Sequence, residues 1–428
     1  MPSGTATEAV LIHLSGPDAP GLTAGVAGVL AAHHVDILDI GQAVVHETLA
    51  LGMLIEVPAG MDFAPVKLAL QARAHELGLQ AHFKKIPRGA VKRWISGRAS
   101  DHDGDHPGVL VAHFIVTVLA RSVTFQHIAR IGAIVAAHGM NIDRIERLSG
   151  RLSGQLAADA GEENACIELA VSGDASREAG IRAEFLAIAQ MECIDIAFQR
   201  EGIFRRNRRL FAFDMDSTLI QGEVIDELAK MAGVGEGVAR ITEAAMRGEL
   251  DFDESFTRRV ALLKGLGEER VTSLLDTIPL ADGAERLIRT LKLLGYKTAI
   301  LSGGFNFFAR SLQQRLGIDF VHSNELEIEN GAVTGRVIPP IINGARKAAL
   351  LAEIAAREGI SLEQVVAVGD GANDIPMLDL AGMGIAYRAK PVLRRSADQS
   401  ISCLGLDGLL YLIGVRDRDI DLHVPREN

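Results

Sequence analysis

Cysteine is scarce in this sequence. Only three cysteines occur in 428 residues (Cys166, Cys193 and Cys403), and they are far apart and have no CxxC spacing. This scarcity argues against a disulfide framework or a structural zinc site and favours a reducing compartment, so we expect a cytoplasmic protein. The first residues also lack a basic segment followed by an apolar core, so we expect no secretory signal. The longest uncharged run, at 19–35, is too short for a membrane span, and we expect no membrane partner.

An excess of positive charge is absent as well. The 44 Lys and Arg residues are outnumbered by 55 Asp and Glu residues, which gives a formal net charge of −11. Such a chain has no general attraction to nucleic acid, and we expect no nucleic-acid partner. The 48% of hydrophobic residues and 23% of charged residues are close to the averages of globular proteins. Because domains usually contain about 100–200 residues, we expect two to four of them.

The first half of the chain contains two similar segments. The tripeptide AAH at 31–33 recurs at 136–138, an offset of 105 residues, and strand and helix candidates on both sides recur at the same offset. Their order is strand–helix–strand–strand–helix–strand, which is typical of ferredoxin-like α+β domains. Chance similarity of short patterns is the alternative. We predict two such domains, at 1–96 and 106–200.

Polar segments follow each of these domains. Residues 97–108, GRASDHDGDHPG, have few large apolar side chains and predict an exposed linker. A metal site at His102, Asp103 and His106 is the alternative, but no regular structure would hold those ligands. Residues 200–210, REGIFRRNRRL, contain five arginines. We interpret this segment as a solvated connector, with a phosphate-binding or nucleic-acid-binding patch as the alternative.

Beyond residue 205, nearly continuous apolar runs alternate with amphipathic helix candidates. The runs lie at 210–213, 297–304 and 365–371, and the helix candidates at 284–295 and 346–359. This alternation indicates a parallel, doubly wound sheet that is covered on both faces. We therefore predict an α/β domain over 205–428. Its mostly helical stretch at about 224–282 is interpreted as a cap inserted after the first strand.

Polar residues follow the strand candidates of this domain. DMDST begins at Asp214, SGGF begins at Ser302, and GDGAND contains Asp370. In an open α/β sheet, ligands bind beyond the carboxyl ends of the strands, so we expect these residues to converge. Asp214 and Asp216 would share a face of an extended strand, where two carboxylates repel each other unless a cation or a proton intervenes. With Asp370 they would offer three oxygen donors suited to Mg²⁺.

These residue types also suit phosphoryl transfer. A carboxylate can attack phosphorus and form an acyl phosphate, and a second carboxylate can protonate the leaving group and then activate water. Lys347, Ser302 and the backbone N–H of Gly303 could stabilise the charge that develops on the phosphoryl oxygens.

DMDST, SGGF, Lys347 and GDGAND together resemble the haloacid-dehalogenase superfamily, and residues 208–410 resemble its phosphoserine phosphatases. The resemblance implies that Asp214 is the nucleophile and Asp216 the general acid and base. It also implies Mg²⁺ bound by Asp214, the backbone carbonyl of Asp216, and Asp370. It further implies that Thr218 and Ser302 contact the phosphate and that Lys347 clamps the nucleophile and the phosphoryl group. Asp374 would orient that lysine or a metal-bound water, and Asn373 would lie near the substrate.

The same resemblance implies a substrate. Glu223 matches the glutamate that binds the substrate ammonium, and Arg259 matches the arginine that binds its carboxylate. Met246 and Phe252 match positions that close over the bound amino acid. The implied reaction is hydrolysis of O-phospho-L-serine to serine and phosphate, the last step of serine biosynthesis. A phosphatase or phosphotransferase for another phosphorylated amino acid is one alternative, and a non-catalytic amino-acid sensor is another.

The N-terminal segment GPDAPG at 16–21 carries a second resemblance, to the ACT domains that sense amino acids. It implies an amino-acid effector, such as serine, near Gly16, Asp18 and Gly21, where backbone N–H groups at a helix start could receive a carboxylate. It also implies a homodimer, since such domains usually pair through their sheets. The second copy has RSVTFQ at 121–126 instead, so we expect that copy to be mainly structural.

Overall fold

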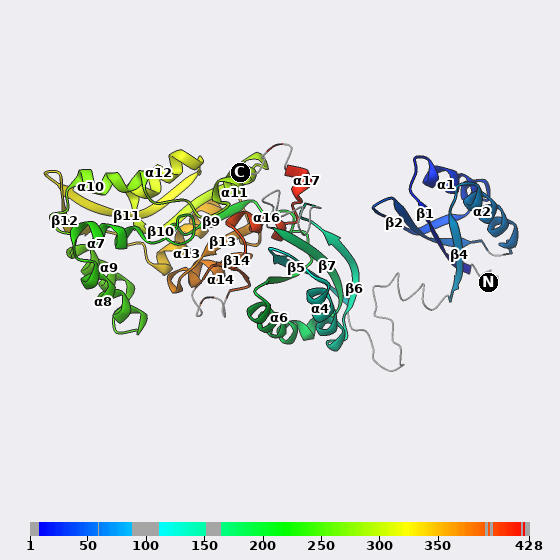
Figure 1. The fold of residues 1–428 in the computed structure, drawn as a ribbon, viewed down its shortest axis with the longest axis horizontal. Helices are drawn as coiled ribbons and strands as arrows, with labels where there is room; N and C mark the ends of the chain where they lie inside the picture. Colours follow the sequence, from blue (N-terminus) through cyan, green and yellow to red (C-terminus); the bar gives the residue numbers. More distant parts are fainter. Residues whose placement is uncertain are drawn as a thin grey trace. The chain divides into compact units, whose positions relative to one another are not determined.

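The computed structural model describes residues 8–58, 60–87, 111–150, 164–389, 393, 397–420 and 423 (Figure 1). They belong to two compact units, Met1–Val111 and Ala112–Asn428, and each unit is described by itself. The linker expected at 97–108, with His102, Asp103 and His106, lies outside the described residues. Within the described ranges, no helix combines the length and the apolar character that crossing a bilayer requires.

The first unit has the expected ferredoxin-like fold. Its elements are β1 (Glu8–Pro17), α1 (Leu22–Ala32), β2 (Asp36–Val45), β3 (Thr48–Val57), α2 (Ala64–Glu76) and β4 (Gln80–Ile86), and the sheet order is β2-β3-β1-β4. Val10, Ile12 and Leu14 of β1 are buried in one core with residues of both helices. The residues between them, Leu11 and His13, are exposed. This alternation shows that one face of the sheet is covered by helices and the other is open.

The second copy has the same fold inside the second unit. Its elements are β5 (Val111–Ala120), α4 (Phe125–Ala137), β6 (Asn141–Arg147), β7 (Ala165–Asp174), α6 (Glu178–Glu192) and β8 (Asp195–Arg200), and the sheet order β6-β7-β5-β8 matches that of the first copy. The difference lies in burial, because every residue of β5 from Phe114 to Ala120 is buried. Phe114, Val116 and Val118 face the helices, so Ile115, Thr117 and Leu119 face a second neighbour.

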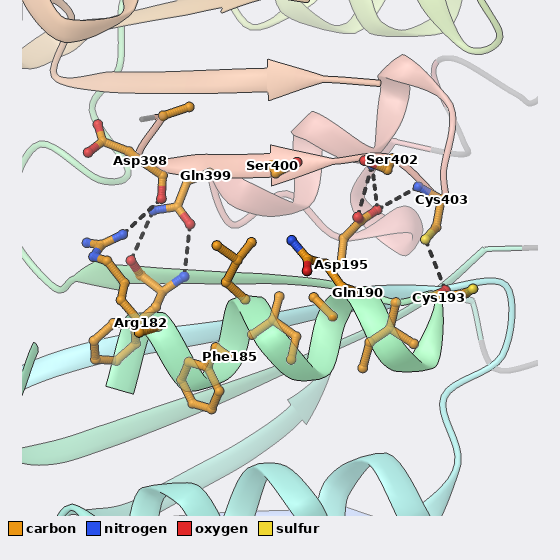
Figure 2. Close-up of a pocket in the computed structure, with 17 residues that line it drawn as sticks. Arg182, Phe185, Gln190, Cys193, Asp195, Asp398, Gln399, Ser400, Ser402 and Cys403 are labelled. Atoms are coloured by element: carbon orange, nitrogen blue, oxygen red, sulfur yellow. Dashed lines mark hydrogen bonds between the residues drawn. The ribbon is translucent and has the colours of Figure 1, made fainter. Parts of the chain in front are cut away.

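That neighbour is the C-terminal domain. Leu119, Cys166 and Ala197 share a hydrophobic core with residues of the α/β domain. The side chain of Gln399 accepts a hydrogen bond from the backbone N–H of Phe198 (2.9 Å) and donates one to its carbonyl (3.0 Å). A cavity of about 440 Å³ lies along this junction, between α6, β8 and the segment that contains Gln399 (Figure 2). The open sheet face of the second copy is therefore interior.

The arginine-rich connector is largely solvated, as expected, except at Arg205 and Arg208. Arg205 is 3% exposed and forms a buried ion pair with Glu168 of β7. Arg208 donates a hydrogen bond to the backbone carbonyl of Glu363. The expectation fails only at these two arginines, because burying a charge requires a partner and their partners are distant in sequence.

The C-terminal domain is the expected doubly wound α/β fold. Its sheet has the order β12-β11-β10-β9-β13-β14-β15 and is parallel except between β11 and β12. The strands are β9 (Leu210–Phe213), β10 (Lys297–Phe305), β11 (Phe320–Glu329), β12 (Ala332–Ile338), β13 (Val365–Gly369), β14 (Met383–Tyr387) and β15 (Gln399–Ile401). Helices α11 (Ala284–Leu293) and α12 (Asn306–Leu316) cover one face, and α13 (Gly344–Arg357) and α14 (Ile375–Leu380) cover the other.

A helical cap follows β9, as expected. It contains α7 (Val224–Ala232), α8 (Gly235–Met246), α9 (Phe252–Ala261) and α10 (Glu268–Ser273). Asp251 caps α9, because its carboxylate accepts the backbone N–H of Glu254 at 2.8 Å. Gly233 ends α7 with a φ of 73°, a left-handed conformation that favours glycine. Short helices α16 (Leu409–Leu412) and α17 (Asp417–Ile420) close the domain against the second copy, where Asp417 accepts the N–H of Gly150 at 2.8 Å.

Candidate active site

Three neighbouring strands bring the predicted polar residues together. Strands β10, β9 and β13 are adjacent and parallel, so their carboxyl ends meet at one edge of the sheet. A cavity of about 630 Å³ lies between this edge and the cap. The predicted residues that line it are Asp214, Asp216, Glu223, Met246, Phe252, Arg259, Gly303, Asp370 and Asn373.

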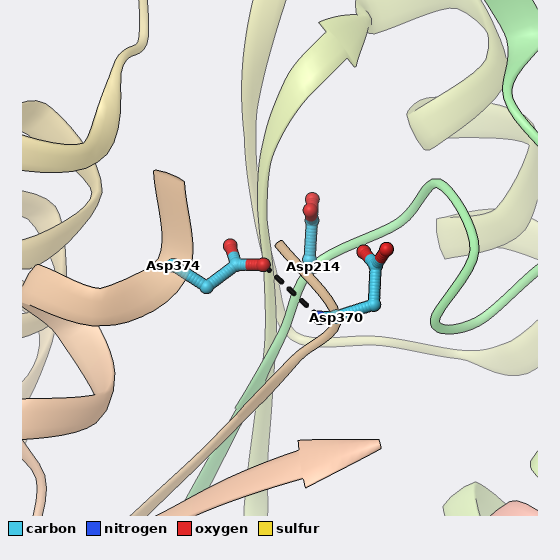
Figure 3. A group of neighbouring side chains, drawn as sticks. All are labelled: Asp214, Asp370 and Asp374. Carbon is cyan, nitrogen blue, oxygen red and sulfur yellow. Dashed lines mark hydrogen bonds between the residues drawn. The ribbon is translucent and has the colours of Figure 1, made fainter. Parts of the chain in front are cut away.

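Three carboxylates form a cluster at the sheet edge (Figure 3). One oxygen each of Asp214, Asp370 and Asp374 lies within 4.8 Å of the other two, and all three residues are buried. This all-oxygen set has the chemistry that Mg²⁺ prefers. The carboxylate of Asp216 is not part of the cluster, because its Oδ1 accepts the backbone N–H of Val224 at 2.9 Å. The carboxylates that come together therefore differ from the expected Asp214, Asp216 and Asp370.

Lys347 connects two of these acids. It is fully buried on α13, and its Nζ lies 2.9 Å from Oδ1 of Asp214 and 2.7 Å from Oδ1 of Asp374. Burial alone would lower the pKa of Lys347, but the charges of Asp214 and Asp374 and the hydrogen bonds to both raise it above its ordinary value. Lys347 is therefore a permanent cation beside Asp214.

Asp374 is held in place by several donors. Besides the ion pair with Lys347, its Oδ2 accepts the backbone N–H groups of Asp370 (3.1 Å) and Gly371 (3.0 Å). Burial and then the negative charge of Asp214 raise the pKa of Asp374 to about 6, against the opposing charge of Lys347. The carboxylate of Asp374 is thus fixed by Lys347 and two backbone N–H groups.

The carboxyl group of Asp216 has a raised pKa. Burial, followed by the negative charge of Asp214, raises the pKa of Asp216 to about 8, and the hydrogen bond from Val224 only partly opposes this. Both leading causes favour the protonated carboxyl group. Asp216 lines the same cavity as Asp214. The two aspartates of this short motif nevertheless have different partners, because Asp216 accepts the N–H of Val224 and Asp214 pairs with Lys347.

The cap places an acid and a base on the opposite wall. Glu223 is the residue before α7, and Arg259 lies on α9, with the Nη1 of Arg259 4.0 Å from Oε2 of Glu223. Burial lowers the pKa of the Arg259 guanidinium, while the charge of Glu223 opposes that effect. The cavity thus has an ion pair at its cap end and an aspartate–lysine centre at its sheet end.

Phe252 and Met246 occupy different parts of the wall. A Cβ atom added to Gly303 would lie 2.7 Å from Cζ of Phe252, so a larger residue at position 303 would make the Phe252 ring shift away from the SGGF motif. Met246 lines the cavity although it is 69% exposed, which places it at the rim.

Thr218 and Ser302 lie deeper than the residues that line the cavity. Both are fully buried. The hydroxyl of Ser302 accepts the backbone N–H of Gly304 at 2.9 Å. The hydroxyl of Thr218 has no hydrogen-bond partner among the described residues.

Sequence reasoning missed Ser255. This residue is 2% exposed, lines the cavity, and has a hydroxyl without a hydrogen-bond partner in the described ranges. It lies one turn of α9 from both Phe252 and Arg259. That spacing of three and four residues puts all three on one helix face, and this signal was available in the sequence.

The candidate effector residues belong to the first unit. Gly21 precedes α1 with a φ of 90°, and its carbonyl accepts the N–H of Gly25 at 2.9 Å. The N–H of Asp18 donates to the carbonyl of Glu47 at 2.8 Å. A Cβ added to Gly16 would lie 2.7 Å from the carbonyl oxygen of Gly78, so this position needs glycine for close packing. These residues form the turn between β1 and α1.

Comparison with known proteins agrees with this architecture. Residues 208–382 match the haloacid dehalogenase-like hydrolase family, and residues 8–84 match the ACT domain. The chain is 40% identical over 413 residues to a phosphoserine phosphatase of Streptomyces coelicolor, which covers 96% of this chain and 93% of the relative. It is 40% identical over 418 residues to a phosphoserine phosphatase of Mycobacterium tuberculosis, covering 97% of this chain and 95% of the relative.

Solved structures are similar to the larger part of the chain. A HAD-family hydrolase of Salmonella enterica superimposes with a TM-score of 0.60 at 30% identity, covering 70% of this chain and 99% of that structure. A probable phosphoserine phosphatase of Vibrio cholerae gives a TM-score of 0.54 at 32% identity, covering 71% and 86%. The chain therefore belongs to the phosphoserine phosphatase family of haloacid dehalogenase-like hydrolases and carries an N-terminal ACT domain.

Proposed function

We propose that this chain hydrolyses O-phospho-L-serine to L-serine and phosphate, the last step of serine biosynthesis, through a phosphoryl group held covalently on Asp214. The observation that carries the proposal is the placement of charged groups at both ends of the cavity. Asp214 lies 2.9 Å from Lys347 at its sheet end, and Glu223 and Arg259 form an ion pair at its cap end. A phosphorylated amino acid has matching groups, with phosphate at one end and an ammonium and a carboxylate at the other.

The reaction needs two proton movements, which we assign to Asp216. Oδ of Asp214 forms a bond to phosphorus while the bond from phosphorus to the serine oxygen breaks, and Asp216 gives its proton to that oxygen. Water then attacks the phosphoryl group on Asp214, Asp216 takes the proton from the water, and Asp214 is released with phosphate. Lys347 stabilises the negative charge of the phosphoryl oxygens throughout.

A divalent cation fits the donor set. Asp214, Asp370 and Asp374 are all buried and lie close enough to share an ion, and carboxylates at this distance repel one another without a cation. We propose that Asp214, the backbone carbonyl of Asp216, and Asp370 hold Mg²⁺, while Asp374 orients Lys347. When bound, the ion supplies positive charge that neutralises the carboxylates and the phosphoryl oxygens.

The cap residues would recognise the amino-acid part of the substrate. Arg259 presents a planar guanidinium to the carboxylate, and Glu223 accepts the ammonium. The hydroxyl of Ser255, which is buried without a partner among the described residues, would donate to the same carboxylate. Phe252 closes the wall above Gly303, and a closed cavity excludes water until the phosphoryl group has reached Asp214.

The front of the chain is proposed to be regulatory. An amino acid such as serine would bind at the turn that contains Gly16, Asp18 and Gly21, and two chains would pair through the first unit. The exposed side chains of Leu11 and His13 on the open sheet face support this pairing. No disulfide joins any of the three cysteines, which supports a cytoplasmic location.

The test is phosphate release from phosphoserine, phosphothreonine and a small aryl phosphate, each measured with Mg²⁺ and with EDTA. We expect phosphoserine to have the highest kcat/KM, EDTA to abolish turnover, and added Mg²⁺ to restore it. Asp214→Asn should lose more than a thousandfold in kcat while keeping the melting temperature, because it removes the nucleophile and little packing. Turnover by this variant, or no preference for phosphoserine, would contradict the proposal.

A further inference from the structure

Helix α9 of the cap contacts the α/β core at several positions, including Phe256 against Phe305 and two neighbouring residues at its N-terminal end. Phe252 lies against Gly303 of the SGGF motif. The carboxylate of the next residue, Asp253, accepts hydrogen bonds from the side-chain amide of Asn343, whose Nδ2 lies 3.1 Å from Oδ1 and 3.2 Å from Oδ2. Asp253 and Asn343 are 90 residues apart, one in the cap and one in the core. This bond therefore exists only while the cap rests on the core.

Asn343 also belongs to the helix that carries Lys347. It is the N-cap of α13, because its Oδ1 accepts the backbone N–H of Arg346 at 3.1 Å. Its own carbonyl accepts the backbone N–H of Lys347 at 2.9 Å. Since Oδ1 is occupied by a backbone donor, the amide orientation is determined, and Nδ2 must face the carboxylate of Asp253. One side chain thus joins the cap to the first turn of the catalytic lysine's helix.

Helix α9 in turn carries the groups that would meet the amino-acid end of the substrate. Ser255 and Arg259 line the cavity from the same helix as Asp253. A shift of α9 away from Asn343 would move both side chains away from the sheet edge. A hydrogen bond to an ionised carboxylate is stronger than one between neutral groups, so the pair can influence this equilibrium.

We propose that Asp253 and Asn343 form a latch that holds the cap closed over the cavity in register with Lys347. Both are positioning residues, which act on the substrate through α9 and α13 and do not touch it. The inference rests on the proposed function for its kinetic consequence, but the latch itself is a property of the cap and the core. It predicts that this donor–acceptor pair adds to the stability of the closed cap, beside the aromatic contact of Phe256 with Phe305.

The decisive variant is Asn343→Asp. Aspartate caps a helix as well as asparagine does, so α13 keeps its first turn, but a carboxylate now opposes the carboxylate of Asp253. We expect kcat/KM for phosphoserine to fall about tenfold, mainly through KM. Turnover of a small aryl phosphate, which has no amino-acid end for α9 to bind, should change less than threefold.

The reciprocal exchange provides the rescue. In the double variant Asp253→Asn with Asn343→Asp, the amide donates from the cap and the carboxylate accepts from the core, so the bond is restored with its direction reversed. We expect kcat/KM for phosphoserine to return to within about threefold of the unmodified protein. Asp251→Asn is the matched control, since it removes a charge from the same turn of α9 but keeps the helix cap, in which the side chain accepts the backbone N–H of Glu254.

Amide hydrogen exchange of α9 gives a readout that does not depend on the substrate. Exchange at Phe252–Ala261 should become faster in Asn343→Asp and return toward the original rate in the double variant, in full-length protein of unchanged melting temperature. Equal α9 exchange in the unmodified protein and Asn343→Asp would overturn the latch, and so would a folded double variant that is not rescued. If the unmodified protein does not turn over phosphoserine, the proposed function fails, and the exchange experiment still decides the latch.

Discussion

At the scale of single residues, the proposed function assigns to Arg259 and Glu223 the recognition of the amino-acid part of the substrate. Arg259→Ala should lower kcat/KM for phosphoserine about a hundredfold, because it removes charged hydrogen bonds to the substrate and leaves Glu223 without its partner at 4.0 Å. Turnover of an aryl phosphate should fall less than threefold. Steady-state kinetics on both substrates checks this, and equal losses would place Arg259 outside substrate recognition.

Ser255 lies on α9 with Arg259 and provides a second test of substrate recognition by this helix. Ser255→Ala should raise KM for phosphoserine about two- to tenfold, the range expected for one neutral hydrogen bond. The melting temperature should stay the same or rise, because the hydroxyl is buried without a hydrogen-bond partner among the described residues. Ser273→Ala, at the end of α10 in the same cap, is the control and should leave KM unchanged. An unchanged KM in Ser255→Ala would remove its proposed contact with the substrate.

The sequence predicted most residues of the site because they belong to short motifs at strand ends. The prediction differed from the structure in the conformation of the DMDST motif. Asp214 and Asp216 were expected to share a strand face, but β9 ends at Phe213, and the chain then turns through Ser217, which has a φ of 55°. Asn343 was not predicted at all, because its partner Asp253 is 90 residues away and leaves no local pattern.

At the scale of elements, the buried ion pair between Arg205 and Glu168 joins the connector to β7. Glu168→Ala should lower the free energy of unfolding by about 3–5 kcal/mol, because it leaves the guanidinium of Arg205 buried without its partner carboxylate. Glu249→Ala, which breaks the exposed pair with Arg247 in the cap, should change the free energy of unfolding far less, because solvent screens this pair.

Denaturant unfolding of both variants measures the difference between these two ion pairs. Similar losses in the two would show that Arg205 finds another partner or reaches solvent.

Most elements were predictable, since strand alternation and helical periodicity are local. The burial of Arg205 within the connector was missed, because a run of arginines is normally solvated and this burial depends on Glu168 in another strand. The sequence did contain a sign of the partner acid, because Glu168 interrupts the apolar run CIELAV of β7. The burial of β5 on both faces left a weaker signal, because FIVTVLA has one polar residue, Thr117, whereas EAVLIHL of β1 has two, Glu8 and His13.

At the scale of the whole molecule, the second ferredoxin-like copy is part of the enzyme's core and the first copy is a separate compact unit. A chain that starts at residue 111 should therefore keep the kcat of the full protein and the melting temperature of its phosphatase unit. A chain that starts at residue 204 exposes the apolar surface that meets Leu119, Cys166 and Ala197, and it should melt lower and aggregate.

Calorimetry and phosphate release on both truncated chains check this prediction. Equal stability of the two would mean that the second copy contributes nothing to the core. The sequence could not have made this distinction from domain boundaries alone, because both copies have the same strand order.

The unequal burial of the two sheets has a consequence for mutational surveys of this gene. Ile115, Thr117 and Leu119 lie on an inner face, so replacing them should lower the amount of folded protein. Leu11 and His13, on the corresponding side of the other copy, are exposed, and their replacement would leave yield intact and alter only what that surface associates with. The two copies share one topology but should differ in which positions tolerate substitution. The effect of a substitution in one copy will therefore not predict the effect of the corresponding substitution in the other.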